Sequence, residues 1–334
     1  MRLLRVELDR FRWRRAVKVL LVAAFVIPLV ILGGTAWSTR PVSEAELAEA
    51  RVTAEREAQQ PYVQDSIEDC IENPETYFGP DANITDPETE CRLANTPRPE
   101  WFISRSPLDV ASVTDDLGTA VPTILAVLLL LAAATYVGAD WNSGSMSNQL
   151  LFEPRRTRVW AAKAAILTLA GLVVGLVVQS LFWLAIRALA ASRDLDVAPD
   201  AWDPVPGIVL RGTLLVVGAA LLGFSLTMLF RSTVVTLGIL FGVAVASTII
   251  IGVLPLDGEN ERYMLHTNVA AVVQRGADYY NSSMDVTCLP DDEGVMTCDG
   301  GRRLSLAGGA SYLALVLLLP GAGGLVSFRR RDVP

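Results

Sequence analysis

The chain has 334 residues, of which 51% are hydrophobic and 19% are charged, and its formal net charge at pH 7 is −8. Its mean hydropathy of +0.39 is too high for an ordinary water-soluble protein. We expect no nucleic acid among its partners.

Charged residues are nearly absent from six long stretches of the chain. These stretches are residues 19–38, 121–138, 161–186, 207–230, 232–255 and 304–327. About 20 apolar residues in a helix cross the hydrocarbon core of a bilayer, which is about 30 Å thick. The sequence therefore predicts an all-α polytopic membrane protein with six transmembrane helices.

Seven basic residues precede the first stretch, as in the first region of a signal peptide. The apolar stretch that follows is too long for a signal peptide, and no convincing cleavage site comes after it, so we predict an uncleaved first span. Residues 1–18 combine arginines with apolar side chains, which predicts an amphipathic helix at the membrane surface. A plain topogenic anchor is the alternative interpretation.

The basic residues predict the orientation of the spans. If the N-terminus is cytoplasmic, the inner segments hold 15 basic and five acidic residues, and the outer segments hold 13 basic and 31 acidic ones. This asymmetry agrees with the positive-inside rule. It places the inner segment 139–160 and the tail 328–334 in the cytoplasm. Segments 39–120 and 256–303 then lie outside.

The outer segment 39–120 is acidic, which we interpret as a solvated surface rather than as cation selectivity. Residues 43–60 are rich in helix formers and predict a helix. The stretches around residues 72–90 and 94–107 are rich in Pro, Asn and Asp, and predict loops. In segment 256–303, the first part predicts a short helix.

All four cysteines fall in the predicted outer segments, and the spans contain none. This distribution predicts disulfides in an oxidising compartment. Three connectivities are possible. The pairs Cys70–Cys91 and Cys288–Cys298 are the most economical, because each closes a loop within one segment. Four free thiols are the alternative.

Several glycines and one short link predict how the spans pack. Gly171-x-x-x-Gly175, Gly238-x-x-x-Gly242 and the glycines of residues 320–324 allow close approach of helices. Only Arg231 separates the stretches 207–230 and 232–255, which predicts an antiparallel helical hairpin.

Motifs for catalysis are absent from the sequence. It has no phosphate-binding loop of the G-x-x-x-x-G-K-[ST] type and no Cys/His cluster with metal-ligand spacing. Its one histidine, His266, is predicted to be a surface residue, and no ionisable residue lies near the middle of a span, where a proton relay would need one. We therefore expect no enzyme activity, cofactor or metal in this chain.

The inner segment between the second and third stretches reads DWNSGSMSNQLLFEPRRTRVWAAK over residues 140–163. The positive-inside rule explains its arginines. It does not explain the two leucines, the phenylalanine or the WNSGS sequence. A short helix broken at Pro154 would present Phe152 and Glu153 away from the membrane.

Residues 138–167 resemble the inner loop of ABC-2-type transporter permeases. The family pattern is an acidic residue, Gly-Ser or Gly-Thr, a leucine pair, Pro-Arg, and a lysine that opens the next span. The matching residues here are Asp140, Gly144, Ser145, Leu150, Leu151, Pro154, Arg155 and Lys163. The ending FRRRDV is similar to the end of many such permeases. The resemblance covers the membrane domain, about two thirds of the chain.

The resemblance implies a transmembrane subunit of an ATP-driven exporter in a bacterial cytoplasmic membrane. ATP and Mg²⁺ would be bound by a separate ATPase subunit, and a second permease copy or a related permease would complete the pathway within the lipid. The inner segment and the N-terminal helix would contact the ATPase. The implied coupling residues are Asp140, Gly144, Ser145, Leu150, Leu151, Phe152, Glu153, Pro154, Arg155, Arg156 and Arg158.

Two other classes of protein are alternatives. A non-transporting sensor or assembly factor would bind a ligand through the acidic outer segment, and would tolerate alanine at Leu150, Phe152 and Glu153. An intramembrane enzyme would need a polar catalytic pair facing a cavity, and the sequence shows none. Segment 39–120 also departs from the leanest permeases, which link their first two spans briefly, and this leaves the substrate open.

Overall fold

The computed structural model describes residues 2–79, 84, 86–105, 107–254, 256, 258–280, 288–290, 296–298 and 301–331. The chain divides into two compact units. The first, here called the membrane unit, comprises residues 1–34, 110–284 and 301–334. The second, here called the disulfide unit, comprises residues 35–109 and 285–300.

Within the described residues, six helices are long and apolar enough to cross a membrane. They are α2 (Arg15–Ser38), α7 (Val110–Asn142), α9 (Arg156–Ala191), α10 (Pro204–Phe230), α11 (Thr233–Val253) and α13 (Leu306–Arg330). The six apolar stretches of the sequence all fall on these helices. The mainly helical fold and the six candidate spans agree with the prediction of a polytopic membrane protein, although the structure also contains short β-strands.

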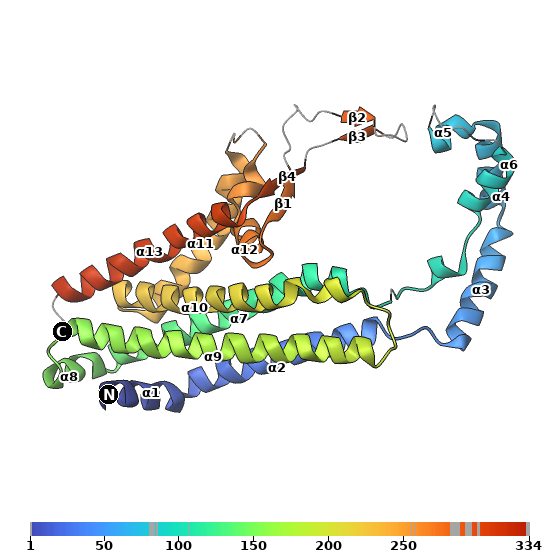
Figure 1. The fold of residues 1–334 in the computed structure, drawn as a ribbon. Helices are drawn as coiled ribbons and strands as arrows, with labels where there is room; N and C mark the ends of the chain where they lie inside the picture. Colours follow the sequence, from blue (N-terminus) through green and yellow to red (C-terminus); the bar gives the residue numbers. More distant parts are fainter. Residues whose placement is uncertain are drawn as a thin grey trace. The chain divides into compact units, whose positions relative to one another are not determined.

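The core of the membrane unit lies among α7, α9 and α10, which run side by side (Figure 1). Gly175 on α9 lets α10 approach closely, because a Cβ atom at this position would lie 3.1 Å from the Cα atom of Thr213. Gly324 on α13 has a similar role against α10, where a Cβ atom would lie 2.6 Å from the carbonyl oxygen of Ser225. The packing role predicted for these glycines is confirmed. Gly238 and Gly242, in contrast, have no atom within 4 Å of such a position.

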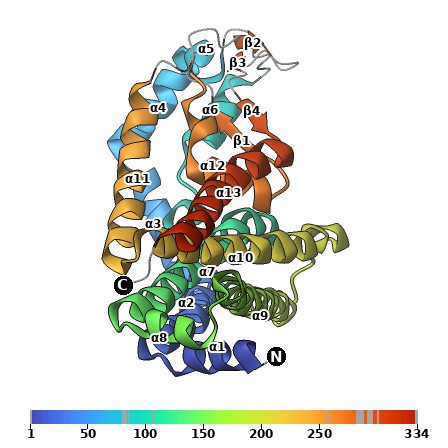
Figure 2. The ribbon, with the colours of Figure 1, turned by 90° about the vertical axis from the view of Figure 1, so that its left-hand side faces the viewer.

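The link between α10 and α11 is as short as predicted, but the two helices do not pack along their lengths as a hairpin. Arg231 ends α10 in the left-handed conformation, with φ 57°, and Ser232 caps α11. The first turn of α11 then packs on α7, where the Thr233 hydroxyl lies against Gly138 and 3.4 Å from the carbonyl oxygen of Ala134. From there α11 leaves α10 at a steep angle (Figure 2).

Shorter elements complete the membrane unit. They are α1 (Arg2–Trp13), α8 (Ser145–Phe152), η2 (Pro199–Trp202), η3 (Asn260–Tyr263), α12 (Leu265–Val273), β1 (Ala277–Tyr280) and β4 (Gly301–Leu304). The amphipathic N-terminal helix and the short helix after residue 256 were both predicted. Strands β1 and β4, which pair antiparallel with Ala277 opposite Leu304, were not.

The disulfide unit contains α3 (Glu44–Ala58), α4 (Pro61–Glu72), α5 (Pro74–Phe78), α6 (Pro87–Asn95) and η1 (Pro99–Phe102). Helix α3 lies where the helix formers of residues 43–60 predict a helix, and a capping box between Ser43 and Glu46 begins it. Helices α5 and α6 lie where loops were expected. Their prolines occupy the first helical position, where the missing N–H costs nothing.

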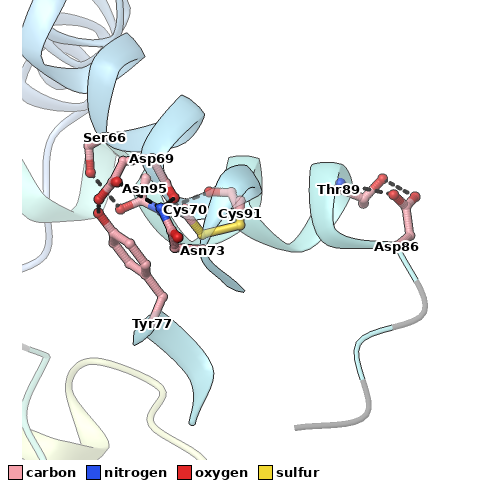
Figure 3. Close-up of a disulfide and its surroundings, with 9 residues drawn as sticks. All are labelled: Ser66, Asp69, Cys70, Asn73, Tyr77, Asp86, Thr89, Cys91 and Asn95. Atoms are coloured by element: carbon pink, nitrogen blue, oxygen red, sulfur yellow. Dashed lines mark hydrogen bonds between the residues drawn. A yellow bond between two sulfur atoms is a disulfide. The ribbon is translucent and has the colours of Figure 1, made fainter. Parts of the chain in front are cut away.

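The Cys70–Cys91 disulfide joins α4 to α6 (Figure 3), and both cysteines are fully buried. Ser66 donates a hydrogen bond to Asn95 across the same pair of helices. Strands β2 (Cys288–Pro290) and β3 (Met296–Cys298) pair antiparallel with Cys288 opposite Cys298. The side chains of those two cysteines lie outside the described part of the chain, as do residues 332–334 of the predicted tail.

Candidate functional site

Three fully buried charged side chains meet at one end of the membrane unit. Lys163 Nζ lies 2.7 Å from Glu7 Oε2 and 2.5 Å from Asp140 Oδ2. All three side chains have no exposed surface. Buried charges are costly unless they are paired and hydrogen-bonded, so this arrangement depends on close contact among the three residues.

Each carboxylate also accepts hydrogen bonds from neutral or cationic donors. Glu7 accepts from the Tyr136 hydroxyl and the Gln149 amide. Asp140 accepts from the Arg14 guanidinium, and from the Ser145 hydroxyl at 2.9 Å. Every carboxylate oxygen therefore has a donor, and a fully satisfied polar network in a low-dielectric site is rigid. We call these seven residues the buried ion cluster.

The buried ion cluster joins four segments that are far apart in the sequence. Glu7 comes from α1, and Arg14 follows that helix. Tyr136 and Asp140 come from the end of α7, Ser145 and Gln149 from α8, and Lys163 from the second turn of α9. These segments gather at the end of the bundle that holds α1 and α8 (Figures 1 and 2). Phe11 packs edge-on against Tyr136, with ring centroids 5.4 Å apart, and closes the cluster on its apolar side.

Local sequence explains how α8 comes to lie against this cluster. Gly144, between α7 and α8, has φ 67°, a left-handed conformation that glycine adopts without strain. Helix α8 then ends at Phe152, and α9 begins at Arg156. The break therefore falls at Pro154, as the sequence predicts.

Helix α8 divides its apolar residues between two environments. Leu150 is partly buried and packs against the core of the membrane unit. Leu151 and Phe152 are 80% and 90% exposed. Exposed apolar side chains on a short helix outside the spans contact either lipid or another protein. We call Leu151 and Phe152 the α8 apolar pair.

The arginines that follow α8 also differ in their contacts. Arg156 Nη1 donates to the carbonyl oxygens of Phe328, at 3.1 Å, and Arg331, at 2.5 Å. It thereby caps the end of α13, where carbonyl groups have no partner within the helix. Arg155 and Arg158 are exposed. A weak ion pair of 3.8 Å joins Arg158 to Glu153.

The structure thus separates the coupling residues expected from the sequence into two groups. Asp140 and Ser145 belong to the buried ion cluster, with Leu150 and Arg156 in internal contacts. The α8 apolar pair, Pro154, Arg155 and Arg158 remain exposed, and Glu153 is partly so. Their contact with an ATPase stays a prediction.

Sequence reasoning missed four members of the buried ion cluster: Glu7, Arg14, Tyr136 and Gln149. One signal was available for Glu7, because it is one of only two acidic residues among the seven basic ones of residues 1–18. Its partner Lys163 is 156 positions away, and no local pattern connects them.

The chain matches no protein-family model, no curated protein sequence and no solved structure. Among the residues that the structure describes, no group of three or more His, Cys, Asp or Glu side chains could hold a metal ion. The features of the molecule that bear on function are therefore its fold, the buried ion cluster and the neighbouring α8 apolar pair.

Proposed function

We propose that this chain is the transmembrane permease subunit of an ATP-driven exporter, and that it binds a separate ATPase subunit through α8 and α1. One observation carries the proposal most directly: the buried ion cluster fixes α8 to α1, α7 and α9, while the α8 apolar pair points away from the core. This combination suits an element that receives force from a partner.

The physical requirement for such coupling is a rigid contact. A partner that moves the spans must contact an ordered element, because a flexible loop would not transmit the movement. Gln149 and Leu150 hold α8 from the inside. The α8 apolar pair offers the buried contact of an interface, and Arg155 and Arg158 offer charges at its rim.

The proposed ATPase-binding end lies on the cytoplasmic side of a bacterial plasma membrane. The chain has its densest basic segment there, in residues 2–18, together with Arg155, Arg158 and the arginines that end α13. Positive residues beside short inner segments favour this orientation. ATP and Mg²⁺ belong to the partner subunit, and a second permease copy or a related permease completes the pathway.

Co-purification tests the proposal. The tagged chain is extracted from its own host in mild detergent, and bound proteins are identified by mass spectrometry. We expect an ATPase in stoichiometric amount, and we expect its loss when Leu151 and Phe152 are both changed to alanine. Leu181→Ala, at a position on α9 that is 55% exposed, is the matched control and should retain the ATPase. A well-folded wild-type chain without any ATPase would contradict the proposal.

A sensor or assembly factor is the second candidate, and one feature of the disulfide unit favours it. An open cavity of about 540 Å³ lies beside α3 and is lined in part by Arg40, Glu46, Glu49 and Arg105. A polar ligand would fit such a lining. The same co-purification separates the two candidates, since a sensor requires no ATPase and tolerates changes in the α8 apolar pair.

A further inference from the structure

A groove of about 430 Å³ runs between α9 and α10 at the end of the bundle opposite the buried ion cluster. Leu176, Ser180, Trp183 and Arg187 form one wall. Their spacing of three or four residues places them on one face of α9. Residues within 202–210, at the end of η2 and the start of α10, form the other wall.

The lining of the groove changes from apolar to charged along its length. Leu176 lies at the deep end, and Arg187 lies about 16 Å farther along the helix, at 1.5 Å per residue. One leaflet of a bilayer contributes about 15 Å of hydrocarbon, half of the total thickness. Lys163 and Arg187 are separated by about 36 Å of helix by the same measure, so the two charges bracket the hydrocarbon core.

Arg187 lies at the mouth of the groove. Among the described residues it forms no ion pair, and its guanidinium lies 5.7 Å from the ring centroid of Trp202. Trp183, about one turn before Arg187 on α9, is 5% exposed. Tryptophan and arginine at the end of a span are typical of the membrane–water interface, where phosphate groups of lipids lie.

We propose that this groove binds a phospholipid, with an acyl chain along Ser180 and Leu176 and the phosphate on Arg187. An amphiphile of one-leaflet length matches both ends of the groove. Arg187 supplies a charge-assisted hydrogen bond to the phosphate. The assignment requires only that α9 and α10 span the membrane, and it is independent of coupling to an ATPase.

The acidic residues in the link between α9 and α10 determine which charge on the lipid headgroup is favoured. Arg193 is the one basic residue of this link, and it is outnumbered by Asp194, Asp196, Asp200 and Asp203, which are all exposed and lie between α9 and α10 in the sequence. They disfavour a headgroup with a net negative charge, and they attract an ammonium group. The groove therefore takes a zwitterionic phosphoethanolamine lipid in preference to an anionic one.

Lipid titration followed by native mass spectrometry tests this site. The full chain is purified in detergent, delipidated and titrated with dioleoyl phosphatidylethanolamine, with dioleoyl phosphatidylglycerol, or with inorganic phosphate. The variants are Arg187→Gln, Ser180→Phe, which fills the groove and leaves the charge, and Arg187→Lys, which keeps the charge. Arg302→Gln, at an exposed position on β4, is the matched control.

We expect one phosphatidylethanolamine molecule to bind with higher affinity than phosphatidylglycerol or inorganic phosphate. This affinity should fall about tenfold in Arg187→Gln, because the variant loses one hydrogen bond to a charged group. Ser180→Phe should also abolish tight binding, whereas Arg187→Lys and Arg302→Gln should retain it. Equal binding in Ser180→Phe and the wild type would overturn the proposal. Competition by millimolar inorganic phosphate would indicate a free-anion site, and tighter binding of phosphatidylglycerol would overturn the headgroup assignment.

Discussion

The substitution Lys163→Met tests whether the buried ion cluster holds α1 in place. Methionine keeps most of the volume of the lysine side chain and removes its charge. Glu7 and Asp140, both fully buried, then lose the cation that lies 2.7 Å from one and 2.5 Å from the other. Lys18 is the only other lysine in the chain, and it is exposed. Lys18→Met is therefore a control with the same chemical change.

The expected magnitude follows from the contacts that remain. Removal of one partner from a buried ion pair costs about 3–5 kcal/mol, because the other charge stays buried without compensation. Glu7 would keep Tyr136 and Gln149, and Asp140 would keep Arg14 and Ser145. We therefore expect a loss near 3 kcal/mol, which corresponds to an increase of about a hundredfold in the local opening constant of α1.

Hydrogen exchange of the backbone amides of α1, measured by mass spectrometry on the chain in detergent, gives that constant. Lys163→Met should accelerate exchange in α1 and α8, and Lys18→Met should not. Glu7→Gln combined with Lys163→Met should restore at least half of the lost protection, because it removes the charge of Glu7, which would keep only a weak 3.9 Å ion pair with Arg10, whereas Asp140 keeps its ion pair with Arg14. If the backbone amides of α1 exchange at the same rate in Lys163→Met and in Lys18→Met, the buried ion cluster does not hold α1 in place.

Three further predictions concern other parts of the chain. Changing Cys70 and Cys91 to serine should destabilise the disulfide unit by about 3 kcal/mol, since the bond closes a loop with a sequence separation of 21; limited proteolysis of segment 39–109 measures this loss. Hydrogen bonds from Arg105 and Ser43 hold the pKa of Glu46 at about 2, below its ordinary value of 4.5. The stability that this carboxylate contributes is therefore present above pH 4.5 and is lost as the pH falls towards 2. Carboxyl NMR should show this low pKa in the wild type and a value nearer 4.5 in Arg105→Gln. Gly324→Ala should lower the thermal unfolding temperature, because the new Cβ atom would lie 2.6 Å from a backbone oxygen of Ser225, whereas Gly242→Ala, with no atom within 4 Å, should leave it unchanged.

The membrane-spanning helices could be predicted from the sequence because their signal is local. Apolar runs of about 20 residues have few alternatives to a transmembrane helix, whatever their neighbours are. The break at Pro154 was predictable for a similar reason, since proline restricts the backbone at and before its own position. The loops expected around residues 72–90 show the limit of such local rules, because Pro74 and Pro87 begin helices there rather than ending them.

The directions in which the spans face could not be predicted in the same way. A helix in lipid is apolar on all sides, so hydrophobicity alone does not reveal which face is buried. Gly175 and Gly242 belong to identical sequence motifs, yet one lies against α10 and the other has no neighbour within 4 Å. The course of α11 depends likewise on the contact of Thr233 with Gly138 on α7, which no local pattern indicates.

The sequence by itself therefore determined that the chain is mainly helical and where its six helices long enough to cross a membrane lie, although α7 begins at Val110, well before the apolar stretch 121–138. Only the tertiary structure decided that Glu7 pairs with Lys163, and that Leu150 turns inward while Leu151 and Phe152 stay exposed. The physical reason is the range of the interactions. Helix formation depends on neighbours a few residues away, whereas charge pairing and burial depend on side chains that packing brings together from distant segments.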